Sequence, residues 1–185
     1  MKANKKNISI FIIWLVHISG FLGMLFYDLD FFAGFTSVNL SVMSIILFLN
    51  FKLNSRRHIL SILSIFLIGM ITESLGVNYG LIFGDYEYGN NLGFKLFGVP
   101  FIIGINWIIL TAISANIASF LTKNKNILSA IGIGALLMLA MDFVMEPIAP
   151  KLDMWRFKNL IVPSSNYIGW LIIGLLTQTI YNLLI

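Results

Sequence analysis

The stretch ILSAIGIGALLMLAMDFVME, residues 127–146, decides the fold class of this chain. Residues 127–141 carry no charge, and a helix that crosses a membrane needs about 20 consecutive, predominantly apolar residues. The whole chain has the same character, because 58% of its 185 residues are hydrophobic and only 11% are charged. A soluble domain carries about 25% charged residues. The sequence therefore predicts an integral membrane protein.

Five further apolar runs of similar length complete the predicted architecture. We expect an all-α, polytopic bundle of about six transmembrane helices, which forms a single transmembrane domain over residues 1–185. The first run follows three lysines, as in a signal peptide, but it lacks an A-x-A cleavage pattern, and we interpret it as an uncleaved helix. The predicted spans cover residues 8–27, 31–51, 59–83, 97–121, 127–146 and 167–185.

The basic residues predict the orientation of these helices, because Lys and Arg favour cytoplasmic loops. We interpret the formal net charge of +4 as a topology signal, so no nucleic-acid partner is expected. A cytoplasmic N-terminus puts most of the bases inside and fits a bacterial inner membrane. The inner bases are then Lys2, Lys5, Lys6, Lys52, Arg56, Arg57, Lys123 and Lys125, and the outer ones are Lys95, Lys151, Arg156 and Lys158.

Two acidic residues lie inside apolar runs. In the predicted topology, Glu73 and Asp142 both lie about two-thirds of the way towards the outer face. An ionisable group at such a depth costs ~2.5 to 3.5 kcal/mol and commonly marks a functional site. The structural alternative is an interhelical hydrogen bond, or an ion pair with Arg156 or Lys158. We favour the functional interpretation.

Asp142 has an acidic neighbour on its own helix. Glu146 follows four residues later, so the two carboxyl groups share one helix face, and Pro147 ends the helix. Two carboxyl groups in a poorly hydrated pocket are not expected both to be ionised, because burial and mutual repulsion each disfavour the charged form. A carboxyl group that keeps its proton in such a pocket can act as a general acid.

The residue types do not favour metal or thiol chemistry. The chain has no Cys, which excludes a disulfide scaffold, a thiolate metal site and a Cys nucleophile. His17 has no second His or Cys nearby, so we interpret it as a hydrogen-bonding residue and not as a metal ligand. We expect no metal and no cofactor.

The second and third thirds of the chain share a weak pattern. An acid, an aromatic loop, a Val-Pro pair, an Asn and a Trp occur in that order in each. The two segments run in the same direction, which would make this a parallel repeat, although coincidence is an alternative. A repeat would place both sets around one outward-facing pocket. The two sets are Glu73, Val99-Pro100 and Asn106-Trp107, and Asp142, Val162-Pro163, Asn166 and Trp170.

These residues and their surroundings resemble a known family. The resemblance is to membrane-embedded carotenoid biosynthesis proteins, which include the γ-carotene and bisanhydrobacterioruberin hydratases. It covers roughly residues 73–170. The first block is ESLGVNYG (73–80), FGDYEY (83–88), LG (92–93), GVP (98–100) and NW (106–107), and the second is Asp142, EP (146–147), Trp155, VP (162–163) and NYIGW (166–170).

The resemblance implies an enzyme that adds water to the terminal double bond of an acyclic carotenoid end, with no cofactor. A protonated acid would donate to the less substituted carbon, and water would capture the tertiary cation. Asp142 or Glu146 would be the acid and Glu73 the base, although the reverse assignment is equally compatible with the sequence. Aromatic faces would stabilise the cation and amides would place the water. The implied aromatic residues are Tyr86, Tyr88, Trp107, Trp155 and Trp170, and the amides are Asn106 and Asn166.

The expected partners are a lipophilic carotenoid, membrane lipid and other enzymes of carotenoid synthesis. Two other functions fit the same residues. The acid could cyclise or isomerise a carotenoid end if water were excluded. Acids at a common depth could instead serve a proton-coupled transporter, but no acid continues towards the cytoplasmic side, and a proton path would need His17 or water. A structural or lipid-interacting membrane protein would leave Glu73 and Asp142 unexplained.

Overall fold

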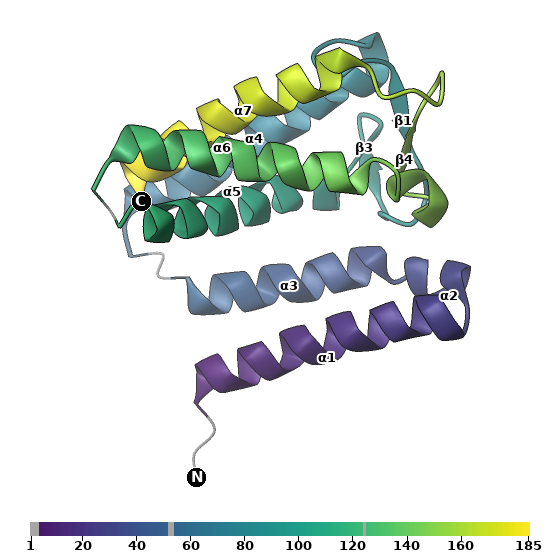
Figure 1. Ribbon diagram of the computed structural model, residues 1–185, viewed down its shortest axis with the longest axis horizontal. Coiled ribbons are helices and arrows are strands. Elements are labelled where there is room, and N and C mark those ends of the chain that lie inside the picture. The colour runs from purple at the N-terminus through teal and green to yellow at the C-terminus, as the bar shows by residue number, and fades with distance from the viewer. Residues whose placement is uncertain (1–3, 52–53, 124) are drawn as a thin grey trace.

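The computed structural model describes residues 4–51, 54–123 and 125–185 (Figure 1). Lys2 and Lys52, two of the bases used for the orientation, lie outside these residues. The helices are α1 (Lys5–Phe26), α2 (Leu29–Ala33), α3 (Thr36–Asn50), α4 (Arg56–Tyr79), α5 (Phe101–Leu121), α6 (Ile127–Met145), the 3-10 helix η1 (Ala149–Leu152) and α7 (Ser164–Leu184). The strands are β1 (Tyr86–Tyr88), β2 (Lys95–Leu96), β3 (Val99–Pro100) and β4 (Trp155–Phe157).

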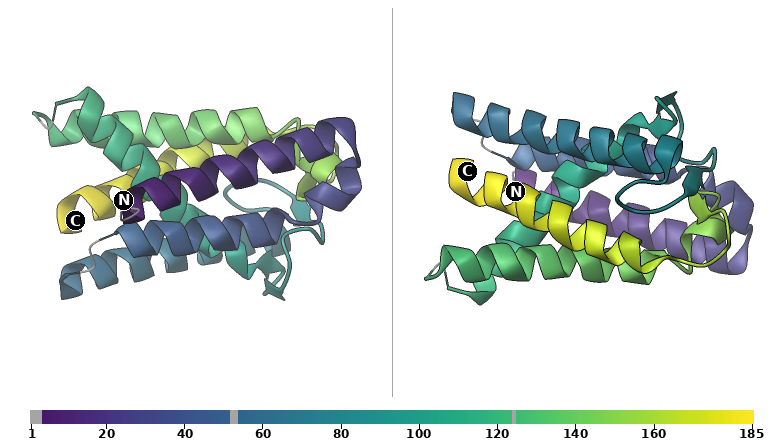
Figure 2. Two further views of the ribbon diagram at one scale, coloured as in Figure 1. Left: turned by 90° about the horizontal axis from the view of Figure 1, so that it is seen from below. Right: turned by 90° about the horizontal axis from the view of Figure 1, so that it is seen from above.

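The described residues form six helical segments that are long and apolar enough to cross a membrane, with α2 and α3 together forming the second. The prediction of an all-α polytopic bundle is confirmed. Helices α4 to α7 pack into one bundle, and α1 to α3 form a hairpin beside it, with α3 packed against α5 (Figure 1). The start of α1 and the end of α7 lie at one end of the molecule, and β1 and β4 lie at the other (Figure 2).

The limits of two predicted spans differ in the structure, the third at its last residue and the fourth at its first. The third was predicted to reach residue 83, but α4 ends at Tyr79 because Gly80 adopts the left-handed conformation with φ of 67°. The fourth was predicted to begin at residue 97, but Val99 and Pro100 form β3, and Pro100 then precedes the first residue of α5. Both differences lengthen the connection between α4 and α5.

The second and sixth spans also differ in detail. The second is divided by a turn at Gly34 and Phe35, where the Thr36 hydroxyl donates a hydrogen bond to the carbonyl of Ala33 at 2.6 Å. The sixth was predicted to begin at residue 167, but α7 begins at Ser164, directly after Pro163. An apolar run alone does not show these turns, because they depend on local hydrogen bonds and proline geometry.

The two long connections meet in a small antiparallel sheet. Strands β1 and β4 pair in a register that puts Glu87 opposite Arg156. This ion pair joins Arg156 Nη2 to Glu87 Oε1 at 2.7 Å, and Lys158 Nζ pairs with Asp85 Oδ1 at 2.8 Å. The sheet holds the α4–α5 connection against the α6–α7 connection, so residues far apart in sequence face the same end of the bundle.

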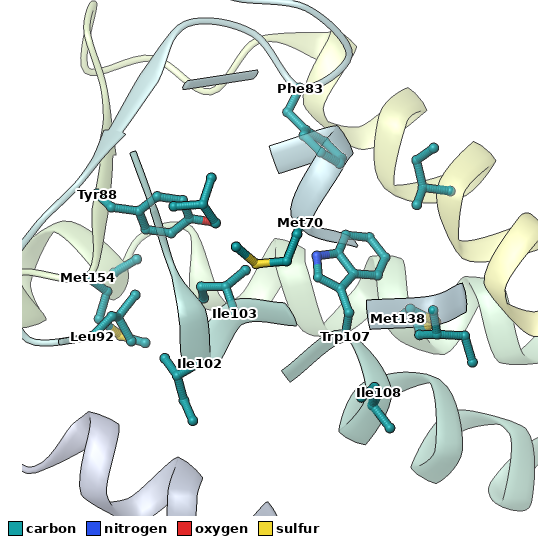
Figure 3. Packing of buried hydrophobic residues seen from close by; sticks show 14 of the residues in the cluster. Met70, Phe83, Tyr88, Leu92, Ile102, Ile103, Trp107, Ile108, Met138 and Met154 are labelled. Carbon is teal, nitrogen blue, oxygen red and sulfur yellow. The ribbon is translucent and has the colours of Figure 1, made fainter. Parts of the chain in front are cut away.

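The apolar core lies between the bundle helices and this sheet. Trp107 and Phe83 are among its largest fully buried side chains, and Figure 3 shows Trp107 with Met70 and Ile103 in the same cluster. Gly69 permits this packing, because a Cβ there would lie 2.5 Å from Cδ1 of Trp107. The helix pair α4 and α5 can thus approach closely around one buried indole.

Candidate active site

A cavity of about 280 Å³ lies beside the β1–β4 sheet, between the bundle and the α1–α3 hairpin. Every residue that the sequence singled out for a site lines it. The three predicted acids are Glu73, Asp142 and Glu146, and the seven predicted substrate-binding residues are Asn106, Trp107, Tyr86, Tyr88, Trp155, Asn166 and Trp170.

Glu73 comes from α4 and is held by three donors. Its Oε2 accepts hydrogen bonds from the hydroxyls of Tyr86 and Tyr88, the latter at 2.7 Å. Its Oε1 accepts from Nε1 of Trp107 at 2.9 Å. Only 4% of Glu73 is exposed, so these three contacts replace the water that a carboxylate would otherwise bind. Donors that converge on both oxygens offset part of the cost that burial imposes on the carboxylate form.

The two tyrosines reach Glu73 because β1 alternates its side chains. Tyr86 and Tyr88 are buried while Glu87 between them is exposed. Burial, followed by the negative charge of Glu73, raises the pKa of both phenols well above the usual value. Both hydroxyls therefore keep their protons at neutral pH and act as donors.

Asp142 and Glu146 form the second acidic group, on α6 and at its C-cap. Nδ2 of Asn166, from α7, donates to Asp142 Oδ2 at 2.7 Å and to Glu146 Oε1 at 3.2 Å. Nε1 of Trp155 lies 3.4 Å from both oxygens of Glu146. Burial raises the pKa of Glu146, although the hydrogen bonds from Trp155, Asp142 and Asn166 oppose this change. These neutral donors, the shared amide of Asn166 and the more distant indole of Trp155, cannot neutralise two buried charges, so a proton on this pair is favoured.

The alternative explanation by ion pairs is wrong for the two buried acids. Arg156 and Lys158 bind Glu87 and Asp85 at the exposed edge of the sheet. Asp142 does take part in an interhelical hydrogen bond, to Asn166. The charged partners that the alternative required are therefore engaged elsewhere.

Two indoles stack beside the acids. The rings of Trp107, from α5, and Trp170, from α7, lie 4.5 Å apart with 14° between their planes. Phe83 contacts both, with ring centroids 6.3 Å from Trp107 and 6.2 Å from Trp170. The two segments of the weak sequence pattern thus each contribute a Trp to this stack, and both line one cavity. The stack gives the cavity an extended aromatic wall.

The α1–α3 hairpin also contributes to the cavity, and the sequence analysis assigned it no site residue. Met24, Thr36, Asn39 and Leu40 all line it. The available signal was a polar residue, Asn39, within an apolar run. His17 is exposed on α1, and its Nδ1 lies 2.8 Å from the carbonyl oxygen of Ile13, so its interpretation as a hydrogen-bonding residue is confirmed.

Residues 4–51, 54–123 and 125–185 contain no group of three His, Cys, Asp or Glu side chains placed to hold a metal ion. The groups available for chemistry in the cavity are carboxyl, phenol, indole and amide. They can transfer protons, donate hydrogen bonds and present aromatic faces to a cation.

A comparison with known families identifies the family of this chain. A family model described as "Carotenoid biosynthesis protein" matches residues 33–185. The chain belongs to this carotenoid biosynthesis family. The match extends from the last residue of α2 to the last residue of the chain and includes all ten predicted site residues. The resemblance predicted from the sequence is confirmed.

One curated relative supports the same assignment. The chain is 28% identical over 138 residues to the bisanhydrobacterioruberin hydratase of Haloarcula japonica. The aligned part covers 71% of this chain and 47% of that protein, so the chain spans about half the length of this relative. No solved structure matches the chain.

Proposed function

We propose that this member of the carotenoid biosynthesis family is a hydratase that adds water to the terminal double bond of an acyclic carotenoid end. The observation that carries the proposal is the pairing of two unlike acidic groups in one cavity. Glu73 is held by three donors, whereas Asp142 and Glu146 share the amide of Asn166. One group is suited to accept a proton and the other to donate one.

The first step transfers a proton from the Asp142–Glu146 pair. The proton adds to the less substituted carbon of the terminal double bond, and the π electrons form the new C–H bond. The other carbon becomes a tertiary cation. The pair gains one negative charge while the substrate gains one positive charge, so the net charge in the cavity does not change.

The second step captures the cation with water. The oxygen of water forms the new C–O bond, and the oxonium ion that results loses one proton to the Glu73 carboxylate. The net addition is one water. Return of the proton from Glu73 to the Asp142–Glu146 pair restores the starting state, and no electron acceptor or cofactor is required.

The aromatic wall supports the cationic intermediate. The stacked pair Trp107 and Trp170 and the phenols of Tyr86 and Tyr88 present π faces or polar edges to the cavity. A cation within about 6 Å of an aromatic face gains about 0.5 to 2 kcal/mol or more, according to its desolvation. The carboxylate of Glu73 adds a nearby negative charge. These groups lower the free energy of the intermediate relative to the neutral alkene.

The relative from Haloarcula japonica supports this choice of reaction, since that protein is named a hydratase. The site residues also favour the assignment of acid and base that the sequence left open. Three donors on Glu73 stabilise its anion, which suits a base. Burial of two like charges in the Asp142–Glu146 pair favours a retained proton, which suits an acid.

Co-expression with an acyclic carotenoid pathway tests the proposal. The pigment should become heavier by one water, which liquid chromatography with mass spectrometry detects. Asp142→Asn should abolish the conversion, because it removes one carboxyl group of the pair and the like charge that helps the other, Glu146, to keep a proton. Asp153→Asn is the matched control, since Asp153 lies in the loop after η1 and bonds the backbone of Asn90. Unchanged pigment with wild-type protein present in the membrane contradicts hydratase activity, and a new pigment of unchanged mass indicates cyclisation or isomerisation.

A further inference from the structure

The cavity is too small to enclose a whole carotenoid. Pockets that enclose a drug-sized ligand have about 300 to 1,000 Å³, whereas this cavity has about 280 Å³. A carotenoid is longer than such a ligand, and its conjugated double bonds keep the chain extended. Only one end of the molecule can therefore lie beside Glu73 and Asp142, and the rest of the polyene has to leave the cavity in one direction.

Two of the three directions out of the cavity are closed to a hydrocarbon. The β1–β4 sheet forms the wall at one end of the bundle, and the exposed ion pair of Arg156 with Glu87 makes the surface beyond it polar. Towards the other end, the interior is filled by Met138, which is fully buried one turn before Asp142. Its sulfur accepts hydrogen bonds from Thr111 and Gln178. The polyene is therefore left with a lateral exit between helices.

A lateral opening lies between α6 and the α1–α3 hairpin. The cavity is lined from both sides of it, by Met141 and Met145 on α6 and by Met24 on α1. Met141 is 46% exposed within a helix that is long and apolar enough to cross a membrane, so the cavity reaches the lipid-facing surface there. Among the described residues, α3 packs against α5 and α2 contacts η1, but no substantial packing joins α6 to α1 or α3 (Figure 1).

We propose that this lateral opening, defined by Met24, Met141 and Met145, admits the carotenoid from the membrane and holds its polyene while one end reacts. The inference rests on the carotenoid substrate of the proposed function. Met141 directly precedes Asp142 and Met145 directly precedes Glu146, so the two methionines share one face of α6 and the two acids share the adjoining face. A chain in the opening thus has its end beside the acids. Unbranched thioether side chains adapt well to such a rigid, apolar surface.

Photo-crosslinking tests the contact without depending on turnover. The photoreactive residue p-benzoylphenylalanine replaces Met141 in the full-length protein, in membranes that contain an acyclic carotenoid. Leu136 is the matched control position, because it is 56% exposed on the same helix, does not line the cavity, and lies about 140° around the helix from Met141. After illumination, mass spectrometry of the intact protein should show the mass shift of an attached carotenoid at position 141 and that of attached lipid at position 136.

Substitution in the same membranes tests whether the opening controls access. Met141→Trp narrows it and should lower conversion of the carotenoid by about 10-fold or more, since one misfitted group in an apolar site has an effect of that size. A higher carotenoid content of the membrane should partly restore conversion, because access is impaired and the acids are unchanged. Met141→Leu keeps a similar volume and should retain most of the conversion. Leu136→Trp adds the same ring to a lipid-facing position away from the cavity and should match wild type.

Three outcomes would overturn the inference. Lipid alone at both crosslinking positions, or equal attachment of carotenoid at both, would show that the opening does not hold the polyene. Wild-type conversion by Met141→Trp would show that the substrate enters elsewhere. Equal losses in Met141→Trp and Leu136→Trp would assign the defect to folding or membrane insertion. Carotenoid attached at position 141 with no hydrated product from the wild-type protein is a separate result, which refutes the proposed hydration and leaves the polyene site in place.

Discussion

Replacement of Glu73 by Gln tests the centre of the proposed site. The substitution keeps the shape of the side chain but removes its charge and turns one oxygen into a donor. In the wild-type protein, three hydrogen bonds from Tyr86, Tyr88 and Trp107 end on a charged acceptor. Bonds to charged groups contribute about 1.5 to 3 kcal/mol each and neutral ones about 0.5 to 1.5, so each contact loses about 1 kcal/mol.

The effect on folding and the effect on turnover should differ in size. The loss across three contacts is at most about 3 kcal/mol, and it is partly offset because a buried charge no longer has to be desolvated. Loss of a general base lowers the rate by about 10² to 10⁴-fold. We therefore expect the Glu73→Gln protein to accumulate in the membrane, with a modestly lower melting temperature, while hydrated product falls by at least about 100-fold.

The assay compares Glu73→Gln with Glu87→Gln in the same membranes. Glu87 is 54% exposed in its side chain and pairs with Arg156 at the surface, so its loss should cost less than about 1 kcal/mol and leave turnover unchanged. Hydrated product is measured by mass spectrometry and folding by the temperature at which solubilised protein aggregates. Full turnover by Glu73→Gln would refute the assignment of Glu73 as the base. Equal losses in both variants would refute the site specificity of the effect.

Two further predictions concern pH and packing. The raised pKa of Glu146 means that its protonated form is present below that pKa and is lost as pH rises through it, so the wild-type rate should fall on the alkaline side. A pH–rate profile should lose or shift this limb in Glu146→Gln, and an unchanged profile would contradict the role of Glu146. Gly69→Ala places a Cβ 2.5 Å from Cδ1 of Trp107 and should destabilise the protein by about 1 to 3 kcal/mol. A thermal aggregation assay should show no such loss for Gly132→Ala, where a Cβ meets no heavy atom within 4 Å, and equal melting temperatures for the two variants would contradict the packing argument.

The apolar runs predicted most of the fold because their length reports one physical requirement. A helix must satisfy its own backbone hydrogen bonds in a membrane, so about 20 apolar residues indicate one crossing. The exact ends were less predictable. Gly80 ends α4 through a left-handed backbone conformation, and the Gly34–Phe35 turn divides the second segment. Hydropathy is insensitive to both features because glycine and phenylalanine are common within apolar helices.

The site was predictable where burial of a polar group is costly. Glu73 and Asp142 stood out because an acid inside an apolar run needs a compensating environment. Asn39 lines the cavity and was missed for a related reason, since an amide in a span has a lower cost and many local partners. Which residues of the α1–α3 hairpin reach the cavity depends on how the hairpin packs against α5, and no sequence pattern states that.

The sequence by itself determined that this protein is a helical membrane protein with two acid-bearing segments of similar pattern. Apolar length and the cost of a buried charge are local properties, and each is readable from one segment. Only the tertiary structure decided that the two segments meet in one cavity, through pairing of β1 with β4 and stacking of Trp107 on Trp170. It also decided how the donors are divided between the acids. Three donors bond Glu73, whereas Asp142 and Glu146 share the amide of Asn166, and the indole of Trp155 lies 3.4 Å from Glu146. Such contacts join residues far apart in the chain, so their geometry follows from packing and not from any local pattern.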